Sequence, residues 1–380
     1  MGCYAAALRR KRLKSMNDTR SNYFKKKKRN RIIILSLVGF ALVAFALFWT
    51  VYDDVESTLK TVFEDVETEN MRKEEVSVDA THPISFALLG IDMYGDGIAE
   101  GSGRSDTIIV ATVNPKTKKT TIVSVPRDSY AEMVGYETNS YPEYNDKITH
   151  AYAFGSTQMA INSIQEFLNV PIDYYVEINM QGLHDIVEAI GGIELTSPLT
   201  FEFEGSSFVE GETVIADGWD ALAFARMRKE DPEGDLGRQN RQRMVIKAIL
   251  DKLISIDSVT NYKKILSAVE VNIQTNLSFE DLLDIKSGYV DALDTFTQLS
   301  IAGEELYYDE IYYYYVDPEE RLRIANTLRD ELEIDQVQFS DMNLSDADSS
   351  FGFGQMTSAG SVTGTSDFDS IEETDEAANN

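Results

Sequence analysis

Residues 32–52 form an unbroken apolar stretch that contains no charged side chain. A helix of about 20 such residues matches the ~30 Å hydrocarbon core of a bilayer, so the stretch predicts one transmembrane helix. Trp49 and Tyr52 lie at its far end, where amphipathic rings favour the interface, and a basic segment, 25–31, flanks the near end. A cleavable signal peptide is disfavoured, because its apolar region is usually ~7–15 residues and small residues follow it, whereas Asp53 and Asp54 follow here. We therefore expect residues 1–31 to form a basic cytoplasmic tail and the C-terminal domain to lie outside the cell.

The net charge is divided unevenly along the chain. The 380 residues carry a formal charge of −29, yet residues 1–31 hold twelve Lys or Arg against one acid, Asp18. That segment has a net charge of +11, so residues 32–380 carry −40. So acidic an exterior argues against nucleic acid as a partner, and membrane orientation and anionic lipid explain the basic head. With one cysteine, Cys3, and three histidines, the sequence excludes a disulfide framework and a zinc site built from Cys and His.

The exterior divides into a stem, a domain and a tail. Residues 53–79 contain ten acids and apolar residues at roughly helical spacing, which predicts a helical stem or, alternatively, a disordered acidic spacer. Residues 80–340 mix strand-like and helix-like segments without internal repeats, which predicts an α/β fold, a three-layer α-β-α domain with a central mixed sheet. The expected strands are 84–91, 107–113, 120–125, 174–178, 193–199 and 296–301, and the expected helices are 158–168, 180–190, 220–227, 238–256, 259–269, 279–293 and 318–332. Residues 341–380 are rich in Ser, Gly, Thr and acids, so we expect an acidic disordered tail.

A local reversal of charge marks the segment from residue 226 to residue 247. Within this otherwise acidic domain it holds Arg226, Arg228, Lys229, Arg238, Arg241, Arg243 and Lys247. Arg238, Arg241 and Gln242 are spaced i, i+3 and i+4, so they share one face of a predicted helix. Arg104 and Arg127 stand at the ends of predicted strands. Because the guanidinium fork suits bidentate contact with phosphate oxygens, these residues predict a phosphate site; a solvated basic face that forms salt bridges is the alternative.

Two carboxylates accompany these cations at strand ends. Asp92 ends the first predicted strand and Asp106 begins the second, so pairing of the two strands would bring the acids together. Two oxygen ligands beside phosphates are typical of Mg²⁺, which completes its octahedron with water and substrate oxygens. Considered alone, each aspartate could equally be a turn or cap residue. Lys147 is a plausible further phosphate contact.

Other side chains give weaker signals. His82, His150 and His184 are isolated, and neither Ser124 nor Ser129 has a neighbouring histidine in sequence, so a Ser-His-Asp hydrolase has no specific support. The tyrosine run 312–315 predicts a strand and its packing, with aromatic stacking on a sugar as the alternative.

These motifs, taken together and in this order, resemble the LytR-CpsA-Psr family of Gram-positive bacteria. The matching blocks are Leu89-Gly-Ile-Asp92, Gly103-Arg-Ser-Asp-Thr107, Asn114-Pro-Lys-Thr-Lys118, Ser124-Val-Pro-Arg-Asp128, Lys147-Ile-Thr-His-Ala-Tyr152, Phe224-Ala-Arg-Met-Arg-Lys229 and Gly234-Asp-Leu-Gly-Arg-Gln-Asn-Arg-Gln242. They lie within about residues 82–255, and the membrane topology agrees. The stem, the segment after about residue 255 and the tail carry no motif of the family.

The resemblance implies a membrane-anchored phosphotransferase that moves an anionic glycopolymer, a teichoic acid or a capsular polysaccharide, from undecaprenyl pyrophosphate to peptidoglycan muramic acid. It implies Mg²⁺ on Asp92 and Asp106 and an apolar pocket for the polyprenyl tail. The residues it implies around the pyrophosphate are Arg104, Arg127, Lys147, Arg226, Arg228, Arg238 and Gln242. It also implies a single-pass type II protein of the cell membrane, in contact with the lipid bilayer, with its C-terminal domain extracellular.

The residue chemistry and the resemblance both predict phosphoryl transfer. Arg127, Arg226 and Arg228 would stabilise the charge on the reacting phosphate, and Asp128 is a candidate base. A non-catalytic regulator that binds polyprenyl pyrophosphate, or a pyrophosphatase, could use the same arginines. A membrane-anchored transcription regulator is disfavoured, because residues 1–31 are too few to form a folded DNA-binding unit.

Overall fold

The computed structural model describes residues 45–46, 49–66, 68, 71–72, 76, 78, 81–92, 103–136, 144–255, 262–308, 310–345 and 347–348. The predicted cytoplasmic tail and most of the predicted transmembrane helix, residues 1–44 and 47–48, lie outside these residues, as do residues 349–380 of the predicted tail. Within the described ranges, no helix is both long enough and apolar enough to cross a membrane.

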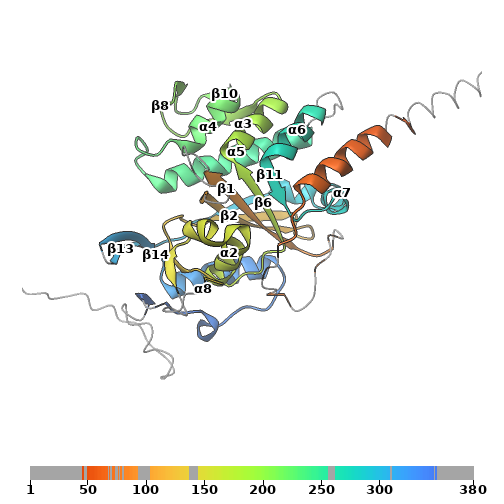
Figure 1. Cartoon of the computed structure of the whole chain (residues 1–380). Helices are drawn as coiled ribbons and strands as arrows, with labels where there is room; N and C mark the ends of the chain where they lie inside the picture. The colour runs from red at the N-terminus through yellow and green to blue at the C-terminus, as the bar shows by residue number, and fades with distance from the viewer. Residues whose placement is uncertain are drawn as a thin grey trace, which may run out of the picture.

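A six-stranded mixed sheet forms the centre of the domain (Figure 1). Its strands, in spatial order, are β11 (Ile273–Thr275), β6 (Tyr174–Asn179), β1 (Ile84–Asp92), β2 (Arg104–Asn114), β3 (Lys119–Ser124) and β12 (Phe296–Leu299). β1 is parallel to β6 and β3 is parallel to β12, whereas the other three pairings are antiparallel. The predicted α/β class with a central mixed sheet is therefore confirmed.

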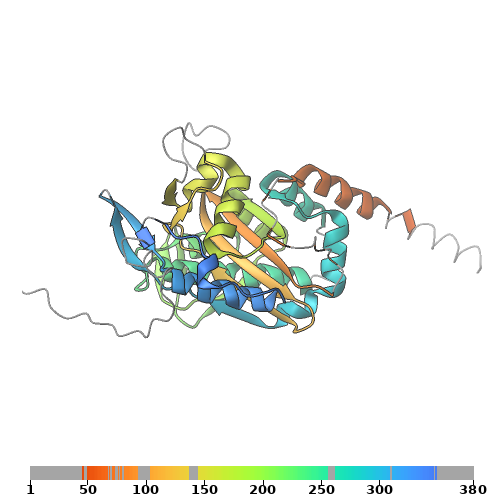
Figure 2. The same ribbon diagram turned by 90° about the horizontal axis from the view of Figure 1, so that it is seen from below.

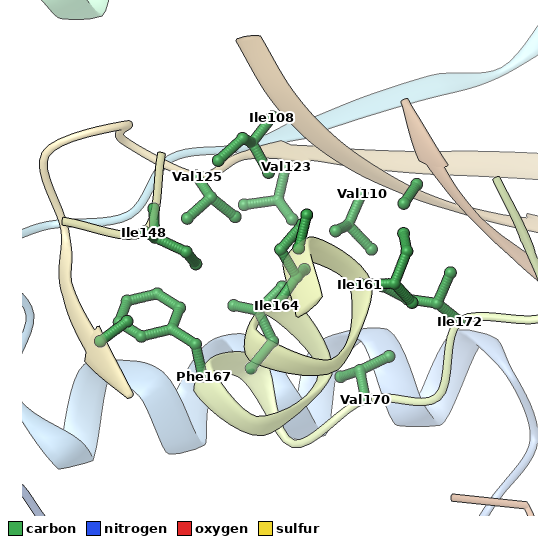
Figure 3. Close-up of a cluster of buried hydrophobic side chains, with 14 of the residues drawn as sticks. Ile108, Val110, Val123, Val125, Ile148, Ile161, Ile164, Phe167, Val170 and Ile172 are labelled. Atoms are coloured by element: carbon green, nitrogen blue, oxygen red, sulfur yellow. The ribbon is translucent and has the colours of Figure 1, made fainter. Parts of the chain in front are cut away.

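Helices cover both faces of the sheet, so the domain has three layers (Figures 1 and 2). The helices are α2 (His150–Leu168), α3 (Met180–Ala189), α4 (Gly218–Arg226), α5 (Asp235–Ser255), α6 (Tyr262–Asn272), α7 (Phe279–Gly288) and α8 (Pro318–Glu331), with 3-10 turns η1 (Val290–Asp294) and η2 (Phe339–Asp341). Successive residues of a strand point to opposite faces, so Leu89 joins the core under α2 and α8 while Leu88 packs with Ile246 of α5. Figure 3 shows the first of these cores, which contains Ile161 of α2 and Val110 of β2.

Local sequence signals fix where several helices begin. The Asp317 carboxylate caps α8, and Pro318 occupies its first turn. Ser278 begins α7 with a capping box. The sequence predicted α2 only from residue 158, but the helix begins at His150, because non-helical backbone at residues 155–156 interrupts the apolar period.

Four two-stranded sheets accompany the central one in the described part of the chain. They are β4 (Tyr130–Glu132) with β5 (Asn145–Lys147), β7 (Ile193–Thr196) with β10 (Thr213–Ala216), β8 (Phe201–Phe203) with β9 (Ser206–Phe208), and β13 (Glu304–Tyr308) with β14 (Ile311–Tyr315). Sequence patterns predicted only β7 and β14 among these strands. Segments this short carry too few residues for an alternating pattern to be recognised.

The segment predicted as a stem lies against the domain. A helix covers residues 49–62, and the ring of its Tyr52 meets Phe279 of α7 edge-on, with the centroids 4.9 Å apart. Further along, Arg72 forms an ion pair with Asp173 at 2.6 Å. The prediction of a helical stem over residues 53–79 is therefore confirmed only up to residue 62. Beyond that residue, Arg72 contacts the domain, which differs from the alternative prediction of a disordered spacer.

Residues 341–345 with 347 and 348, which the sequence placed in the tail, belong to the folded domain. Asp348 is buried, forms an ion pair with Arg321 of α8 at 2.7 Å, and accepts a hydrogen bond from the Tyr315 hydroxyl at 2.8 Å. The domain therefore extends at least to residue 348.

Candidate active site

Two predicted acids lie where β1 ends and β2 begins. Asp92 is the cross-strand neighbour of Arg104, whereas Gly90 pairs with Thr107. The register shifts between these pairs and leaves Asp106 as the extra residue of a β-bulge. A bulge re-aims a side chain away from regular strand alternation. The structure thus brings Asp92, Arg104 and Asp106 together at one end of the central sheet.

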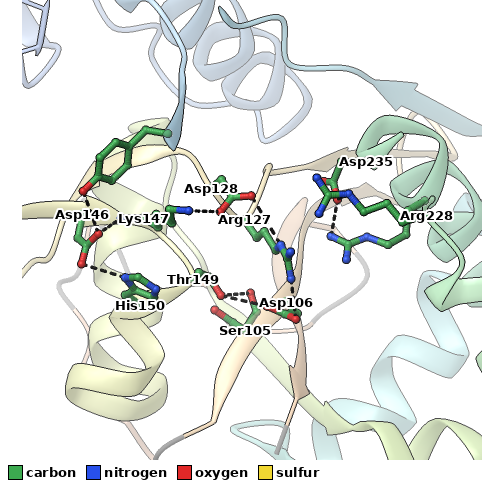
Figure 4. Close-up of polar contacts among 12 residues, drawn as sticks. Ser105, Asp106, Arg127, Asp128, Asp146, Lys147, Thr149, His150, Arg228 and Asp235 are labelled. Carbon is green, nitrogen blue, oxygen red and sulfur yellow. Dashed lines mark hydrogen bonds and ion pairs between the residues drawn. The ribbon is translucent and has the colours of Figure 1, made fainter. Parts of the chain in front are cut away.

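Arg127 connects Asp106 to the loop after β3 (Figure 4). Its Nη1 donates to Asp106 Oδ2 at 2.8 Å, and its Nε lies 3.7 Å from Asp128 Oδ2. Thr149 Oγ1 lies 3.4 Å from the other Asp106 oxygen. Burial alone would favour the neutral guanidine, but the carboxylates of Asp106 and Asp128 outweigh it and hold the pKa of Arg127 above its usual value. Arg127 is therefore a fixed and permanently charged group beside the bulge.

Lys147 reaches the same loop from the β4–β5 hairpin. Its cross-strand neighbour is Tyr130, which follows Asp128 closely in sequence. Its Nζ lies 2.9 Å from Asp128 Oδ1. Asp128 therefore sits between two cations, Arg127 and Lys147, so that three residues predicted separately form one unit.

A second ion-pair group comes from the start of α5. Asp235 Oδ1 lies 2.7 Å from Arg238 Nη2 and 3.5 Å from Arg228 Nε. Burial lowers the pKa of Arg238, Asp235 opposes this effect and Arg127 adds to it. An arginine nevertheless stays protonated in proteins. The charge of Asp235 also contributes to the raised pKa of Arg127. The ion-pair group around Asp106 and the one around Asp235 are therefore neighbours, as Figure 4 shows. We refer to them together as the ion-pair cluster, which consists of Asp106, Arg127, Asp128, Lys147, Arg228, Asp235 and Arg238.

Two buried donors of the cluster are unsatisfied. Among the described residues, neither the Nε of Arg127 nor the Nε of Arg238 has a hydrogen-bond partner. A buried donor without a partner costs ~1–3 kcal/mol. The guanidinium groups of Arg127 and Arg238 are therefore candidate ligands for an anion with several oxygens, such as a phosphate. Asp235 Oδ1, a buried acceptor in the same cluster, likewise lacks a hydrogen-bond partner among the described residues.

An apolar cavity of about 280 Å³ adjoins the ion-pair cluster. Its walls come from β1, β6, α3, α5 and α6, and most of the lining is aliphatic. Its polar lining includes Thr107, Arg226 and Gln242. Thr107 follows Asp106 directly, and Gln242 lies one helical turn after Arg238. The polar lining of the cavity is therefore next to cluster residues along the chain, although no residue of the cluster itself lines the cavity.

A second apolar cavity of about 230 Å³ continues the first. The two share the lining residues Leu88, Val176, Ile246 and Leu250. The second cavity extends under α7, where Ile285 contributes to its wall. We refer to the two cavities together as the apolar channel, which leads from the cluster along one face of the sheet.

Arg226 lies at the end of α4, where it lines the apolar channel. Its Nη1 forms an ion pair with Glu204 at 2.7 Å, from the turn between β8 and β9. Arg226 and Gln242 therefore mark the mouth of the channel, while Arg228 belongs to the ion-pair cluster.

Arg241 has a structural position instead. Its spacing predicted a shared helical face with Gln242, yet its side chain is fully buried. It forms an ion pair with Asp231 and donates to the carbonyl oxygens of Phe224, at 2.9 Å, and Met227. The connection from α4 to α5 folds over this side of α5, so Arg241 holds that connection in place and does not belong to the ion-pair cluster.

Asp92 and Asp106 are the candidate ligands of the expected Mg²⁺. Within the described ranges, no group of three or more His, Cys, Asp or Glu side chains could hold a metal ion. Asp92 and Asp106, from paired strands, offer two carboxylates. Mg²⁺ usually takes one or two protein carboxylates and fills its other positions with water and phosphate oxygens. The residues present therefore fit a metal that binds together with a phosphate ligand.

Three residues at the site were missed by sequence reasoning. Asp235 was detectable from its i, i+3 spacing to Arg238. Thr149 and Glu204 act through tertiary contacts, so no local pattern marks them.

Comparison with known proteins places the chain in a family. Residues 50–330 match the model of the LytR_cpsA_psr family. The chain belongs to the LytR_cpsA_psr family. The match extends beyond the motif range 82–255 at both ends, because it includes the helix over residues 49–62 and the segment after residue 255. At its N-terminal end it also exceeds the predicted 80–340 domain.

Relatives of this LytR_cpsA_psr protein include enzymes and solved structures. The polyisoprenyl-teichoic acid–peptidoglycan teichoic acid transferase TagU of Bacillus licheniformis is 40% identical over 309 residues, which cover 81% of this chain and 97% of that protein. A solved structure from Enterococcus faecalis, described as a transcriptional regulator, has a TM-score of 0.62 and 41% identity, and the match covers 74% of this chain and 97% of that one. The structure of TagT bound to LIIa-WTA has a TM-score of 0.58 and 27% identity, with coverage of 70% and 97%.

Proposed function

We propose that this LytR_cpsA_psr protein is a membrane-anchored phosphotransferase that moves an anionic glycopolymer, a teichoic acid or capsular polysaccharide, from undecaprenyl pyrophosphate to peptidoglycan muramic acid. The observation that carries the proposal is the apolar channel that leads to the ion-pair cluster. The channel suits an isoprenoid tail and the cluster suits a pyrophosphate, in the order in which such a donor carries them. The name of the Bacillus licheniformis relative supports the same reaction.

Each predicted residue has a role in this proposal. The pyrophosphate is bound by Arg104, Arg127, Lys147, Arg226, Arg228, Arg238 and Gln242. Arg127, Arg226 and Arg228 stabilise the negative charge that spreads over the phosphoryl oxygens in the transition state. Asp92 and Asp106 would hold Mg²⁺, which when bound neutralises charge on the pyrophosphate.

Asp128 is proposed as the base, because its carboxylate lies within the ion-pair cluster, where its contacts with Arg127 and Lys147 fix its position. It accepts the proton of a muramic acid hydroxyl while that oxygen forms a bond to the sugar-side phosphorus. The bond from this phosphorus to the bridging oxygen breaks, and undecaprenyl phosphate leaves with the bridging oxygen. The polymer is then joined to peptidoglycan through a phosphodiester.

The proposed anchor is the apolar stretch 32–52, with residues 1–31 cytoplasmic and the C-terminal domain extracellular on a Gram-positive cell membrane. The helix over residues 49–62 supports a short connection between anchor and domain. Its Asp54 forms an ion pair with Lys263 of α6 at 3.1 Å, and its Tyr52 contacts α7. The apolar channel extends under α7, so a lipid tail in the channel would point towards the anchored side of the domain.

Two other activities would use the same residues. A receptor for polyprenyl pyrophosphate would leave the donor intact, and a pyrophosphatase would transfer the phosphoryl group to water, so the products separate both from the proposed reaction. The description of the Enterococcus faecalis structure suggests a third activity, transcriptional regulation. A net charge of −40 outside residues 1–31 disfavours this activity, because it disfavours contact with nucleic acid.

We expect the substitution Ile246→Asp to weaken lipid binding. Ile246 lines both parts of the apolar channel, and a carboxylate there would have to be desolvated beside an isoprenoid tail. Mass spectrometry should find polyprenyl pyrophosphate co-purified with the full-length wild type and at least about tenfold less with the variant. Ile215→Asp, at an exposed position of β10, is the matched control and should retain the lipid. Equal lipid in the two variants would contradict the assignment of the channel.

We expect Asp92→Asn to raise the Mg²⁺ concentration needed for half-maximal transfer by at least about tenfold, because a direct carboxylate ligand is lost. Asp330→Asn, which changes an exposed carboxylate of α8, should leave the Mg²⁺ requirement unchanged. The measurement is the transfer rate as a function of free Mg²⁺. A wild-type rate that survives complete chelation of divalent ions would refute the metal assignment.

A further inference from the structure

A tyrosine-rich hairpin projects from the domain beside the ion-pair cluster. It consists of β13 and β14, and Figures 1 and 2 show it extending from the body of the fold. One of its faces is buried, since Tyr313 and Tyr315 pack with Tyr130 and Ala347. The other face carries Tyr307 and Tyr312, which are direct cross-strand neighbours with ring centroids 5.7 Å apart. The hairpin is therefore fixed to the domain by one face while the other presents an aromatic pair.

The hairpin is attached to the loop that carries Arg127 and Asp128. The backbone N–H of Tyr314 donates to the carbonyl oxygen of Asp128 at 2.8 Å, and Ser129 forms a parallel bridge with Tyr314. The Nζ of Lys147 lies 5.6 Å from the centroid of the Tyr312 ring. Any shift of the hairpin would therefore disturb the Asp128 loop, and the tyrosine pair forms a direct continuation of the cluster.

The exposure of the pair has no structural explanation. Tyr307 is 66% exposed, although burial of an aromatic ring is among the strongest sources of stability in a fold. Tyr312 is only partly buried, and burial raises the pKa of its hydroxyl, with Glu305 and Asp128 adding to the effect. Its hydroxyl therefore stays neutral, as a donor and acceptor for uncharged polar groups.

The hairpin and the apolar channel meet the cluster at different residues. A sequence of contacts runs from the channel at Thr107 through Asp106, Arg127, Asp128 and Lys147 to Tyr312. In an in-line phosphoryl transfer the attacking and leaving oxygens lie on opposite sides of the phosphorus. If the lipid phosphate leaves on the channel side, the attacking hydroxyl arrives on the hairpin side.

We propose that Tyr307 and Tyr312 form the platform on which sugar rings of the acceptor glycan strand stack, an inference that rests on the proposed function. An amphipathic ring with a polar tip suits a pyranose, which has an apolar face and a rim of hydroxyl groups. The acceptor is favoured over the donor polymer by charge. Glu305 on β13, which lies on the same face of the hairpin as Tyr307, is exposed beside the pair and would repel the phosphates of an anionic polymer.

The test compares Tyr307→Ser/Tyr312→Ser with Tyr307→Phe/Tyr312→Phe in the full-length protein. We expect the serine variant to raise the KM for a peptidoglycan glycan oligomer roughly tenfold or more, while donor affinity stays at the wild-type value. The phenylalanine variant, which keeps both rings, should stay within about threefold of wild type. Trp219→Ser, which removes an exposed aromatic ring on α4, is the control and should leave the acceptor KM unchanged.

A second measurement separates this inference from the proposed function. Binding of the glycan oligomer is measured without donor, by calorimetry on the same variants. If the wild type transfers no polymer, the proposed function fails, yet weaker glycan binding by the serine variant would still support the platform. If the serine variant binds the glycan and uses it as acceptor as well as wild type does, or if only donor affinity changes, the platform is wrong.

Discussion

Arg127→Ala should lower the rate of glycopolymer transfer by ~10²–10³-fold, as for the loss of other fixed donors that stabilise developing charge. Arg127 is the residue that joins the bulge acid Asp106 to Asp128, and its buried Nε has no hydrogen-bond partner within the described residues. A phosphoryl oxygen bound there would gain a donor that requires no reorganisation during the reaction. Transfer to peptidoglycan by the purified full-length protein is the measurement.

The controls for Arg127 separate charge from geometry. Arg127→Lys keeps the positive charge but loses the planar guanidinium group and its paired N–H donors. We therefore expect a transfer rate between those of wild type and Arg127→Ala. Arg323→Ala removes an exposed arginine of α8 that pairs with Glu320, and it should transfer at the wild-type rate. If Arg127→Ala, folded by circular dichroism, transferred within twofold of wild type, the ion-pair cluster would not be the site of chemistry.

Arg241→Met should lower the free energy of unfolding by about 3–5 kcal/mol, the cost of removing one partner of a buried pair. The substitution leaves the Asp231 carboxylate buried without its cation, and the carbonyl oxygens of Phe224 and Met227 without a donor. Urea unfolding followed by circular dichroism measures the effect. The connection that carries Arg228 should loosen too, so transfer should fall even where the variant is folded.

A control for Arg241 lies on the same helix. Lys247 forms an exposed i, i+4 ion pair with Asp251, and such pairs contribute well under ~1 kcal/mol. Lys247→Met should therefore leave the urea midpoint almost unchanged. Equal destabilisation by the two substitutions would show that Arg241 is not the structural support that its burial indicates.

Much of the fold could be predicted from the sequence, because long apolar strands and helices carry regular patterns. The runs that became β1, β2 and β3 and the helical spacing of α5 and α8 are such cases. The prediction failed where regularity breaks. The backbone at Gly155 and Ser156 hid residues 150–157 of α2, and most of the short two-stranded sheets had too few residues for a pattern.

The site was predictable in its residue types but not in its arrangement. Strand ends and arginine spacing identified Asp106, Arg127 and Arg238, since these signals are local. The bulge that singles out Asp106 depends on the pairing register of two strands, which no single segment determines. The spacing of Arg241 from Arg238 is the one expected of a residue that faces a ligand. Its burial under the α4–α5 connection, where it pairs with Asp231, gives it a structural role that local spacing does not reveal.

At the ion-pair cluster, we expect a phosphoryl group to pass from the lipid carrier to a sugar hydroxyl. The most direct test uses wild-type protein with Mg²⁺, a peptidoglycan acceptor and a donor that carries ³²P only at the sugar-side phosphorus. The proposal predicts that the label becomes covalently bound to peptidoglycan while one unlabelled undecaprenyl phosphate is released for each polymer transferred. Label that appears only in free polymer phosphate, at a rate independent of the acceptor, would contradict transfer and show hydrolysis instead.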